Sequence, residues 1–193
     1  VIHALQRTID LEALARHRGS SFGRLPGGQP TQIDFENALG IALLRRSAQD
    51  DRRTWLEDES RLIGRCAIPL DFRPRMEEAP IALVEEPLES RVQVVLEDYV
   101  VNLRPLYGDG DEGFELFAAS LLSGLDRVQK RLGGLMHRRA RESMEQALAA
   151  QRAGGDPGAH RAWIELLLVH YYDPMYDWQL SQKRGTVLFR GRR

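Results

Sequence analysis

The hydrophobic pattern of this chain changes at Pro87, and that change limits its possible folds more than any other feature. Before Pro87, short strand-like segments at 8–11, 53–57 and 81–84 alternate with helical spacing at 34–47. Strands that alternate with helices indicate a parallel α/β sheet. After Pro87, four segments with helical periodicity are separated by turn clusters, at 88–103, 113–132, 137–153 and 159–180. This second pattern predicts a helical subdomain.

The ends of these segments set the expected boundaries. A last strand-like segment, 186–189, lies between Gly185 and Gly191. We predict an α/β core over residues 1–87, a helical subdomain over 88–184 and a final strand over 185–193 that rejoins the sheet. The glycine- and proline-rich stretch 18–30 is expected to be a loop, and Asp34 is the expected N-cap of the helix that follows it.

Composition excludes several classes of protein. The 193 residues carry 27 basic and 28 acidic side chains, so the net charge of −1 provides no overall basic field for nucleic acid. A single cysteine, Cys66, excludes an internal disulfide and C-x-x-C motifs, and the five histidines lack metal-ligand spacing. The longest apolar stretch, 164–172, is too short to cross a bilayer, and no signal peptide is seen. We expect a cytoplasmic protein without a metal centre.

The segment Gly19-Ser20-Ser21-Phe22-Gly23 fits the G-x-S-x-G pattern of a hydrolase nucleophile elbow. That elbow needs a strand before the serine and a helix after it, whereas here a helical run precedes the motif and glycines and proline follow it. An anion cradle is the better functional interpretation, because glycines let backbone N–H groups approach a ligand and two arginines, Arg18 and Arg24, flank the loop. A flexible polar loop without a ligand is the alternative.

An acidic cluster, Glu57-Asp58-Glu59, follows the apolar pair Trp55-Leu56. It resembles the end of a Walker B strand, where a carboxylate positions magnesium near phosphates or polarises a nucleophile. A solvated acidic strand end is the alternative. If this strand is central in a parallel sheet, its carboxyl end opens at the ligand crevice, which favours a role for Asp58 and Glu59.

Two features of the helical part suit nucleic acid. The stretch 127–141 contains no acid and includes Arg138 and Arg139, so it could follow a phosphate backbone, although a solvated helix face has the same composition. Tyr171, Tyr172 and Tyr176 cluster around a proline, where they could stack on bases or fill a core between helices.

Five blocks of the chain, read together, resemble the bacterial tRNA 2-selenouridine synthase family: 10–23, 35–37, 55–64, 171–176 and 187–191. The resemblance extends from about Thr8 to Gly191. It implies a transferase with an N-terminal rhodanese-like domain and a C-terminal P-loop-type α/β domain. In that family the wobble 2-thiouridine of tRNA is S-geranylated with geranyl diphosphate, and selenium from selenophosphate then replaces the geranylthio group. The resemblance also implies the anticodon arm of tRNA and a selenophosphate synthetase as partners.

The chain departs from the family pattern in two ways. It contains no rhodanese-like domain, and Cys66 does not match the rhodanese cysteine. It also contains no G-x-x-x-x-G-K-[ST] loop. We therefore expect a P-loop NTPase-like core that lacks its first strand and its phosphate loop, as the C-terminal remainder of such an enzyme.

We hypothesise that Asp58 and Glu59 are catalytic and that no cofactor is permanently bound, geranyl diphosphate and selenophosphate being co-substrates. The substrate and its diphosphate are assigned to His17, Arg18, Gly19, Ser20, Ser21, Phe22, Gly23, Ser60 and Arg61. The tRNA is assigned to Arg138, Arg139, Tyr171, Tyr172 and Tyr176. The alternative is a catalytically silent fragment that acts as a tRNA-binding or dimerisation module. A small-molecule kinase is a weaker third reading, because no nucleotide phosphate loop is present.

Overall fold

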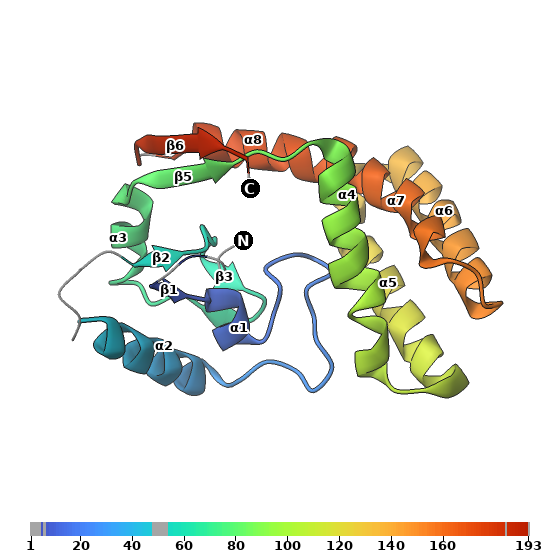
Figure 1. The fold of residues 1–193 in the computed structure, drawn as a ribbon, viewed down its shortest axis with the longest axis horizontal. Helices are drawn as coiled ribbons and strands as arrows, with labels where there is room; N and C mark the ends of the chain where they lie inside the picture. The colour runs from blue at the N-terminus through green and yellow to red at the C-terminus, as the bar shows by residue number, and fades with distance from the viewer. Residues whose placement is uncertain (1–4, 6, 48–53, 184, 193) are drawn as a thin grey trace. The chain divides into compact units, whose positions relative to one another are not determined.

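The computed structural model describes residues 5, 7–47, 54–183 and 185–192, and Figure 1 shows their secondary structure. The chain is divided into two compact units. Unit 1 contains the residues up to Ala82 together with Gly185–Phe189, and unit 2 contains Leu83–Arg184 together with Arg190–Arg192. The division falls inside the strand β5 (Ile81–Val84).

Unit 1 begins with two very short parallel strands. β1 (Thr8–Ile9) pairs with β2 (Trp55–Leu56), with Thr8 opposite Trp55 and Ile9 opposite Leu56. The helix α1 (Leu11–Ala15) follows β1 directly, because the carboxylate of Asp10 accepts a hydrogen bond from the Ala13 N–H at 2.6 Å and so caps the helix. The helix ends at Arg16, which adopts the left-handed conformation at φ 48°.

The long helix of unit 1 is α2 (Gln32–Ser47), and its N-cap differs from the prediction. Thr31 occupies the cap: its hydroxyl accepts from the Asp34 N–H at 3.2 Å and donates to the Asp34 carboxylate at 2.7 Å. The Thr31 hydroxyl thus satisfies the Asp34 N–H, so Asp34 is the third helical residue and not the cap. Phe35 and Leu39 are buried on the inner face of the helix.

A β-hairpin that the sequence analysis missed closes the core of unit 1. β3 (Leu62–Ile63) and β4 (Cys66–Ala67) are antiparallel and joined by Gly64 and Arg65. A short helix, α3 (Arg73–Glu78), follows. The buried core of unit 1 consists of Ile9, Leu11, Ala15, Phe35, Leu39, Ile63, Cys66 and Ile68. Cys66 is therefore a core residue, and burial raises the pKa of its thiol.

The predicted single parallel sheet is not formed by the described strands. β5 pairs with β6 (Val187–Gly191) and not with β1 or β2, so the described strands make three separate two-stranded sheets. The apolar sequence of β5 favours a buried strand, but its residues are alternately half-buried and exposed. Strands of two residues offer too few backbone groups to extend a sheet, and Pro80 and Pro87 stop β5 at both ends.

Unit 2 is helical throughout its long central segment. α4 (Leu88–Leu96) continues into the π-helical turn Glu97–Val101 and the 3-10 turn Arg104–Tyr107. α5 (Gly110–Leu132) and α6 (Gly134–Arg152) follow. After the 3-10 turn Pro157–His160 come α7 (Arg161–Leu167), the π-helical turn Leu168–Tyr172 and α8 (Asp173–Ser181). The described chain is thus a mixed α/β structure in which helix predominates.

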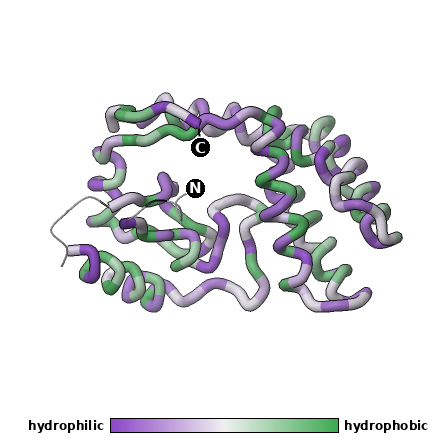
Figure 2. The backbone as a smooth tube through the Cα atoms, viewed as in Figure 1, coloured by the Kyte–Doolittle hydropathy of each residue, from purple (hydrophilic) through white to green (hydrophobic). Residues whose placement is uncertain are grey.

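Amphipathic spacing explains the packing of unit 2. Figure 2 shows hydrophobic and hydrophilic residues alternating along its helices. α6 packs against both α5 and α7, and Phe117, Met144 and Trp163 are fully buried among them. Within the part of the chain that the structure describes, no helix combines the length and the apolar character that a membrane span needs.

Candidate functional site

Carboxylates gather at the carboxyl end of the parallel strands of unit 1. Asp10 directly follows β1, and Glu57 directly follows β2. Because the two strands are parallel, their carboxyl ends lie at the same edge. The Leu11 N–H donates to the Glu57 carboxylate at 2.9 Å, which joins the end of β2 to the first turn of α1. This edge is where open α/β sheets bind their ligands.

Gly19 brings the predicted substrate loop against this acidic edge. Its φ is +62°, and a Cβ placed on it would lie 2.5 Å from Glu59 Oε1 and closer still to Glu12 Oε1. Gly19 and Glu59, which the sequence hypothesis placed in one site, are therefore adjacent. Glu12, in the first turn of α1, was missed, although it lies within the block 10–23 and one turn of helix after a strand end.

Burial and mutual repulsion change the acidity of this group of carboxylates. The pKa of Glu12 is raised to about 8, first by burial, then by the charge and hydrogen bond of Glu59, and further by Glu57 and Asp10. Burial also raises the pKa of Glu57 and of Glu59, whereas the hydrogen bond from Glu12 lowers the pKa of Glu59. Near neutral pH Glu12 is therefore protonated, and its carboxylic acid lies beside Glu59.

The loop from His17 to Arg24 is ordered by its own hydrogen bonds. His17 and Arg24 form an antiparallel bridge, and the Arg18 N–H donates to the Gly23 carbonyl at 2.9 Å. The Ser20 carbonyl accepts a hydrogen bond from the Gly23 N–H at 3.0 Å, and the Ser20 hydroxyl accepts one from the Phe22 N–H at 3.2 Å. The loop is thus a compact turn and not a flexible one.

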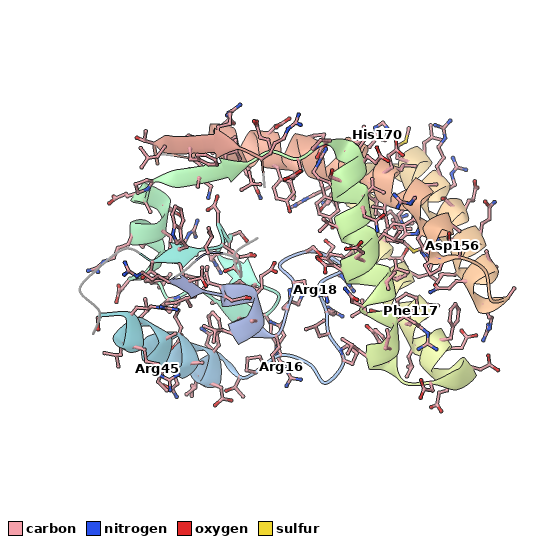
Figure 3. All side chains as sticks on the ribbon, in the orientation of Figure 1. Arg16, Arg18, Arg45, Phe117, Asp156 and His170 are labelled. Carbon is pink, nitrogen blue, oxygen red and sulfur yellow. The ribbon has the colours of Figure 1, made fainter. Side chains whose placement is uncertain are left out.

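This order changes how the loop could hold an anion. The N–H groups of Arg18, Phe22 and Gly23 donate within the loop, and so does that of Ser20, to the Arg18 carbonyl at 2.7 Å. These four backbone groups are therefore not available to an anion, and the side chains of the predicted cradle, Arg18, Arg24, Ser20 and Ser21, become the more important donors. Arg18, labelled in Figure 3, and Ser21 are half-buried, whereas His17, Phe22 and Gly23 are buried.

The remaining residues assigned to the substrate lie on the segment between β2 and β3. Asp58, Ser60 and Arg61 are all exposed. The Ser60 hydroxyl donates to the Leu62 carbonyl at 3.3 Å, and the Arg61 carbonyl accepts from the Ile68 N–H at 3.1 Å. The structure brings Glu59 to Gly19, and it places Asp58, Ser60 and Arg61 on the surface.

The residues assigned to tRNA lie in unit 2. Arg138 and Arg139 are exposed on α6. Tyr172 lies between Tyr171, which it meets edge-on at 4.9 Å between ring centroids, and Tyr176, on which it stacks at 6.1 Å with the planes 24° apart. Tyr171 is buried whereas Tyr176 is 55% exposed. The tyrosines therefore form a row that begins in the core and ends at the surface.

Metal ligation receives no support from the described residues. Nowhere among them do three His, Cys, Asp or Glu side chains converge as metal ligands. The most buried histidine of unit 2, His160, is used structurally: its Nδ1 accepts from the Trp163 indole N–H at 2.9 Å, and its Nε2 lies 3.0 Å from Gln151 Oε1. Burial lowers the pKa of His160 to about 4.

Carboxylates at the ends of two parallel strands, in a chain that continues into a helical unit, define a mixed α/β domain. A family described as the tRNA 2-selenouridine synthase AAA domain matches residues 1–193. This chain belongs to the tRNA 2-selenouridine synthase family, which confirms the resemblance inferred from the sequence.

Curated relatives agree with this assignment. The tRNA 2-selenouridine synthase of Alcanivorax borkumensis is 49% identical over 199 residues, covering all of this chain and 54% of the relative. Those of Marinobacter nauticus and Pseudomonas fluorescens are 50% and 49% identical, covering 99% and 100% of this chain and 53% of each relative. The chain therefore spans about half the length of the curated relatives that it matches. No solved structure matches the chain.

Proposed function

We propose that this chain carries the geranyl- and selenium-transfer site of a tRNA 2-selenouridine synthase. In this reaction the wobble 2-thiouridine of tRNA is converted first to S-geranyl-2-thiouridine with geranyl diphosphate, and then to 2-selenouridine with selenophosphate. The names of the relatives support the tRNA modification, and the residue blocks quoted above support the two co-substrates. The enzyme would act in the cytoplasm, supplied with selenophosphate by a selenophosphate synthetase.

The observation that carries this proposal is the contact of Gly19 with Glu12 and Glu59 at the carboxyl end of the parallel strands. In the first step the sulfur of 2-thiouridine forms a bond to the geranyl carbon, and the carbon–oxygen bond breaks so that diphosphate leaves with the electron pair. The leaving diphosphate gains negative charge, which a nearby acid can neutralise. Glu12 has a pKa of about 8 and is protonated at neutral pH, so it can donate that hydrogen bond or proton.

Glu59 and the arginines complete the assignment. Glu59 lies beside Glu12 and can take up the shared proton between turnovers. Because the edge is acidic, a diphosphate also needs cations there, and Arg18 and Arg61 are the arginines of the assigned segments. In the second step the selenium of selenophosphate forms a bond to C2 of the base, and the carbon–sulfur bond breaks so that geranylthiolate leaves and takes a proton to become the thiol, for which the same carboxyl pair is suited. Water then cleaves the phosphorus–selenium bond, which releases phosphate and leaves 2-selenouridine.

The test places this chain in a complete enzyme. The matching part of the Marinobacter nauticus synthase is replaced by this chain, and the chimera is incubated with 2-thiouridine tRNA and geranyl diphosphate. Mass spectrometry of the digested nucleosides should show S-geranyl-2-thiouridine. Glu12→Gln and Glu59→Gln should each reduce its rate of formation about a hundredfold. The exposed Glu78 of α3 provides the control Glu78→Gln, which should leave the rate unchanged.

Two results would contradict the proposal. If the native relative produces the nucleoside and the chimera does not, this chain lacks the function. If Glu12→Gln and Glu59→Gln react as fast as Glu78→Gln, the chemistry lies elsewhere in the enzyme.

We further propose that unit 2 holds the anticodon arm through Arg138, Arg139 and Tyr176. Exposed arginines suit phosphates, and the exposed end of the stacked tyrosine row suits an unstacked base. The double variant Arg138→Ala/Arg139→Ala should reduce the salt dependence of tRNA binding, lowering the slope of log K against log salt by roughly 1 to 2. Tyr176→Ala should weaken binding without changing that slope, whereas the exposed Leu116→Ala should change neither.

A further inference from the structure

Unit 1 contains a pocket that shares only Asp10 with the carboxylate edge. It has a volume of about 310 Å³ and lies between β1, α1 and α2. Its walls are apolar and are formed by Ile9, Ala13, Leu14 and Ala42. Figure 1 shows α2 beside β1 and α1, and contacts join α2 to both elements. The volume lies at the lower end of the range for small-molecule sites, which favours a short apolar group.

The polar side chains of this pocket carry more positive than negative charge. Arg45 and Arg46, in the last turn of α2, line it together with one carboxylate, Asp10. Arg46 is held in place by a hydrogen bond of 3.0 Å to the Thr8 carbonyl. The Asp10 carboxylate is engaged by the Ala13 N–H as the cap of α1. Arg45, labelled in Figure 3, is exposed and can therefore meet a ligand.

An apolar cavity with guanidinium groups beside it suits a ligand that has an apolar chain and an anionic head. The substrate loop does not offer such a surface, because Phe22, its aromatic residue, is only 6% exposed. Asp10 lines the pocket and also raises the pKa of Glu12, so the pocket adjoins the carboxylate edge around the start of α1.

We infer that this pocket binds the apolar chain of an isoprenoid diphosphate, with Arg45 as a contact for the diphosphate. The inference rests on the proposed function, which supplies geranyl diphosphate as the ligand. It adds the position of the geranyl chain, between α1 and α2. It also adds a cation, Arg45, that the site hypothesis did not include.

The experiment measures binding to the full chain by calorimetry, with geranyl diphosphate and inorganic diphosphate as separate probes. Ala13 is exposed at the pocket, so Ala13→Trp fills the cavity without replacing a core residue. The control is Ile41→Trp, which adds the same ring at an exposed position of α2 that does not line the pocket. Circular dichroism verifies that each variant is folded.

Ala13→Trp should weaken geranyl diphosphate binding about tenfold or more, because the geranyl chain loses its buried surface. The same variant should leave inorganic diphosphate binding unchanged, and Ile41→Trp should affect neither probe. Arg45→Ala should weaken both probes several-fold, whereas Arg75→Ala, an exposed arginine on α3, should weaken neither.

The inference would be overturned if geranyl diphosphate binds Ala13→Trp as tightly as it binds Ile41→Trp. It would also be overturned if geranyl diphosphate fails to bind the parent chain. The proposed function has a separate readout, the S-geranyl nucleoside formed by the chimera. A chimera that carries Ala13→Trp and still produces this nucleoside at the parent rate overturns the pocket alone. A chimera that carries the unmodified chain and forms no product overturns the proposed function.

Discussion

At the scale of single residues, Gly19 shows how tightly the carboxylate edge and the substrate loop are joined. Its backbone has φ +62°, and the carboxylates of Glu12 and Glu59 occupy the space that a side chain would need. Gly28 has a similar φ of +72°, but nothing lies within 4 Å of its missing Cβ. Substitutions at the two glycines therefore distinguish the cost of backbone strain, present at both, from the cost of steric conflict with the site, present only at Gly19.

We predict that Gly19→Ala lowers the free energy of unfolding by roughly 2–4 kcal/mol, because strain and the displacement of two carboxylates add together. Gly28→Ala should cost about 1 kcal/mol, from backbone strain alone. Urea unfolding of both variants compares the two costs. Equal losses would show that the carboxylates move aside freely and that Gly19 is not held against them.

At the scale of elements, Gln29 joins three pieces of unit 1. Its amide N–H groups donate to the Ala15 carbonyl at 3.1 Å and to the Ile63 carbonyl at 2.8 Å, and its oxygen accepts from the Arg65 N–H at 2.8 Å. One side chain thus provides hydrogen-bond partners for backbone groups at the end of α1, in β3 and in the hairpin turn. These elements are too short to pair those groups themselves.

We expect Gln29→Leu to lower the unfolding free energy by about 2–3 kcal/mol, since it leaves these backbone groups without their partner. The exposed Gln129 of α5 provides the matched control, and Gln129→Leu should change stability by less than about 0.5 kcal/mol. A loss at Gln29 no larger than this would mean that water replaces the amide at little cost.

In unit 2, an ion pair anchors α8 to α4. Both guanidinium NH groups of Arg91 meet the carboxylate of Asp173, with the second contact at 3.0 Å, and both side chains are one-third exposed. In contrast, the pair Arg73–Glu77 lies within one helix, and both of its side chains are more than 40% exposed.

Asp173→Ala should therefore lower the unfolding free energy by roughly 1–3 kcal/mol, because it leaves a partly buried guanidinium without its carboxylate. Glu77→Ala should change it by less than about 1 kcal/mol, as is usual for exposed pairs. Thermal unfolding provides the comparison. Because Asp173 begins the helix that carries Tyr176, its loss should also weaken tRNA binding, and unchanged binding would separate this anchor from the tRNA surface.

At the scale of the whole molecule, the two units should respond to pH in opposite directions. The folded pKa of Glu12 in unit 1, about 8, lies above its ordinary value of 4.5, so the stability of unit 1 falls as the pH rises from about 4.5 to 8. The folded pKa of His160 in unit 2, about 4, lies below its ordinary value of 6.5. The stability of unit 2 therefore falls as the pH drops from 6.5 to about 4.

Separate reporters can follow each unit. Thiol labelling of buried Cys66 reports the opening of unit 1, and the fluorescence of buried Trp163, in a background with Trp55 and Trp178 replaced by phenylalanine, reports unit 2. Glu12→Gln should flatten the pH profile of Cys66 labelling, and His160→Gln should flatten that of Trp163. Parallel profiles for the two reporters would contradict the assignment of these groups.

Local patterns in the sequence determined much of the secondary structure. Helical spacing placed α2 and the long helices of unit 2, and glycine and proline placed the loop 18–30, because these signals depend on neighbouring residues. The block pattern also determined the family, which the comparisons confirm. Strands of two residues have no periodicity to detect, so β3 and β4 were missed, and the choice between Thr31 and Asp34 as the cap depended on side-chain geometry.

Long-range packing decided the rest. The pairing of β5 with β6 joins segments that lie about one hundred residues apart, and no local signal specifies it. The site likewise depends on the fold: Glu12 acquires its raised pKa only when burial brings it against Glu59 and Gly19. The sequence by itself determined which helices form and to which family the chain belongs. Only the tertiary structure decided which carboxylates meet, because desolvation and Coulomb repulsion arise between residues that folding brings together.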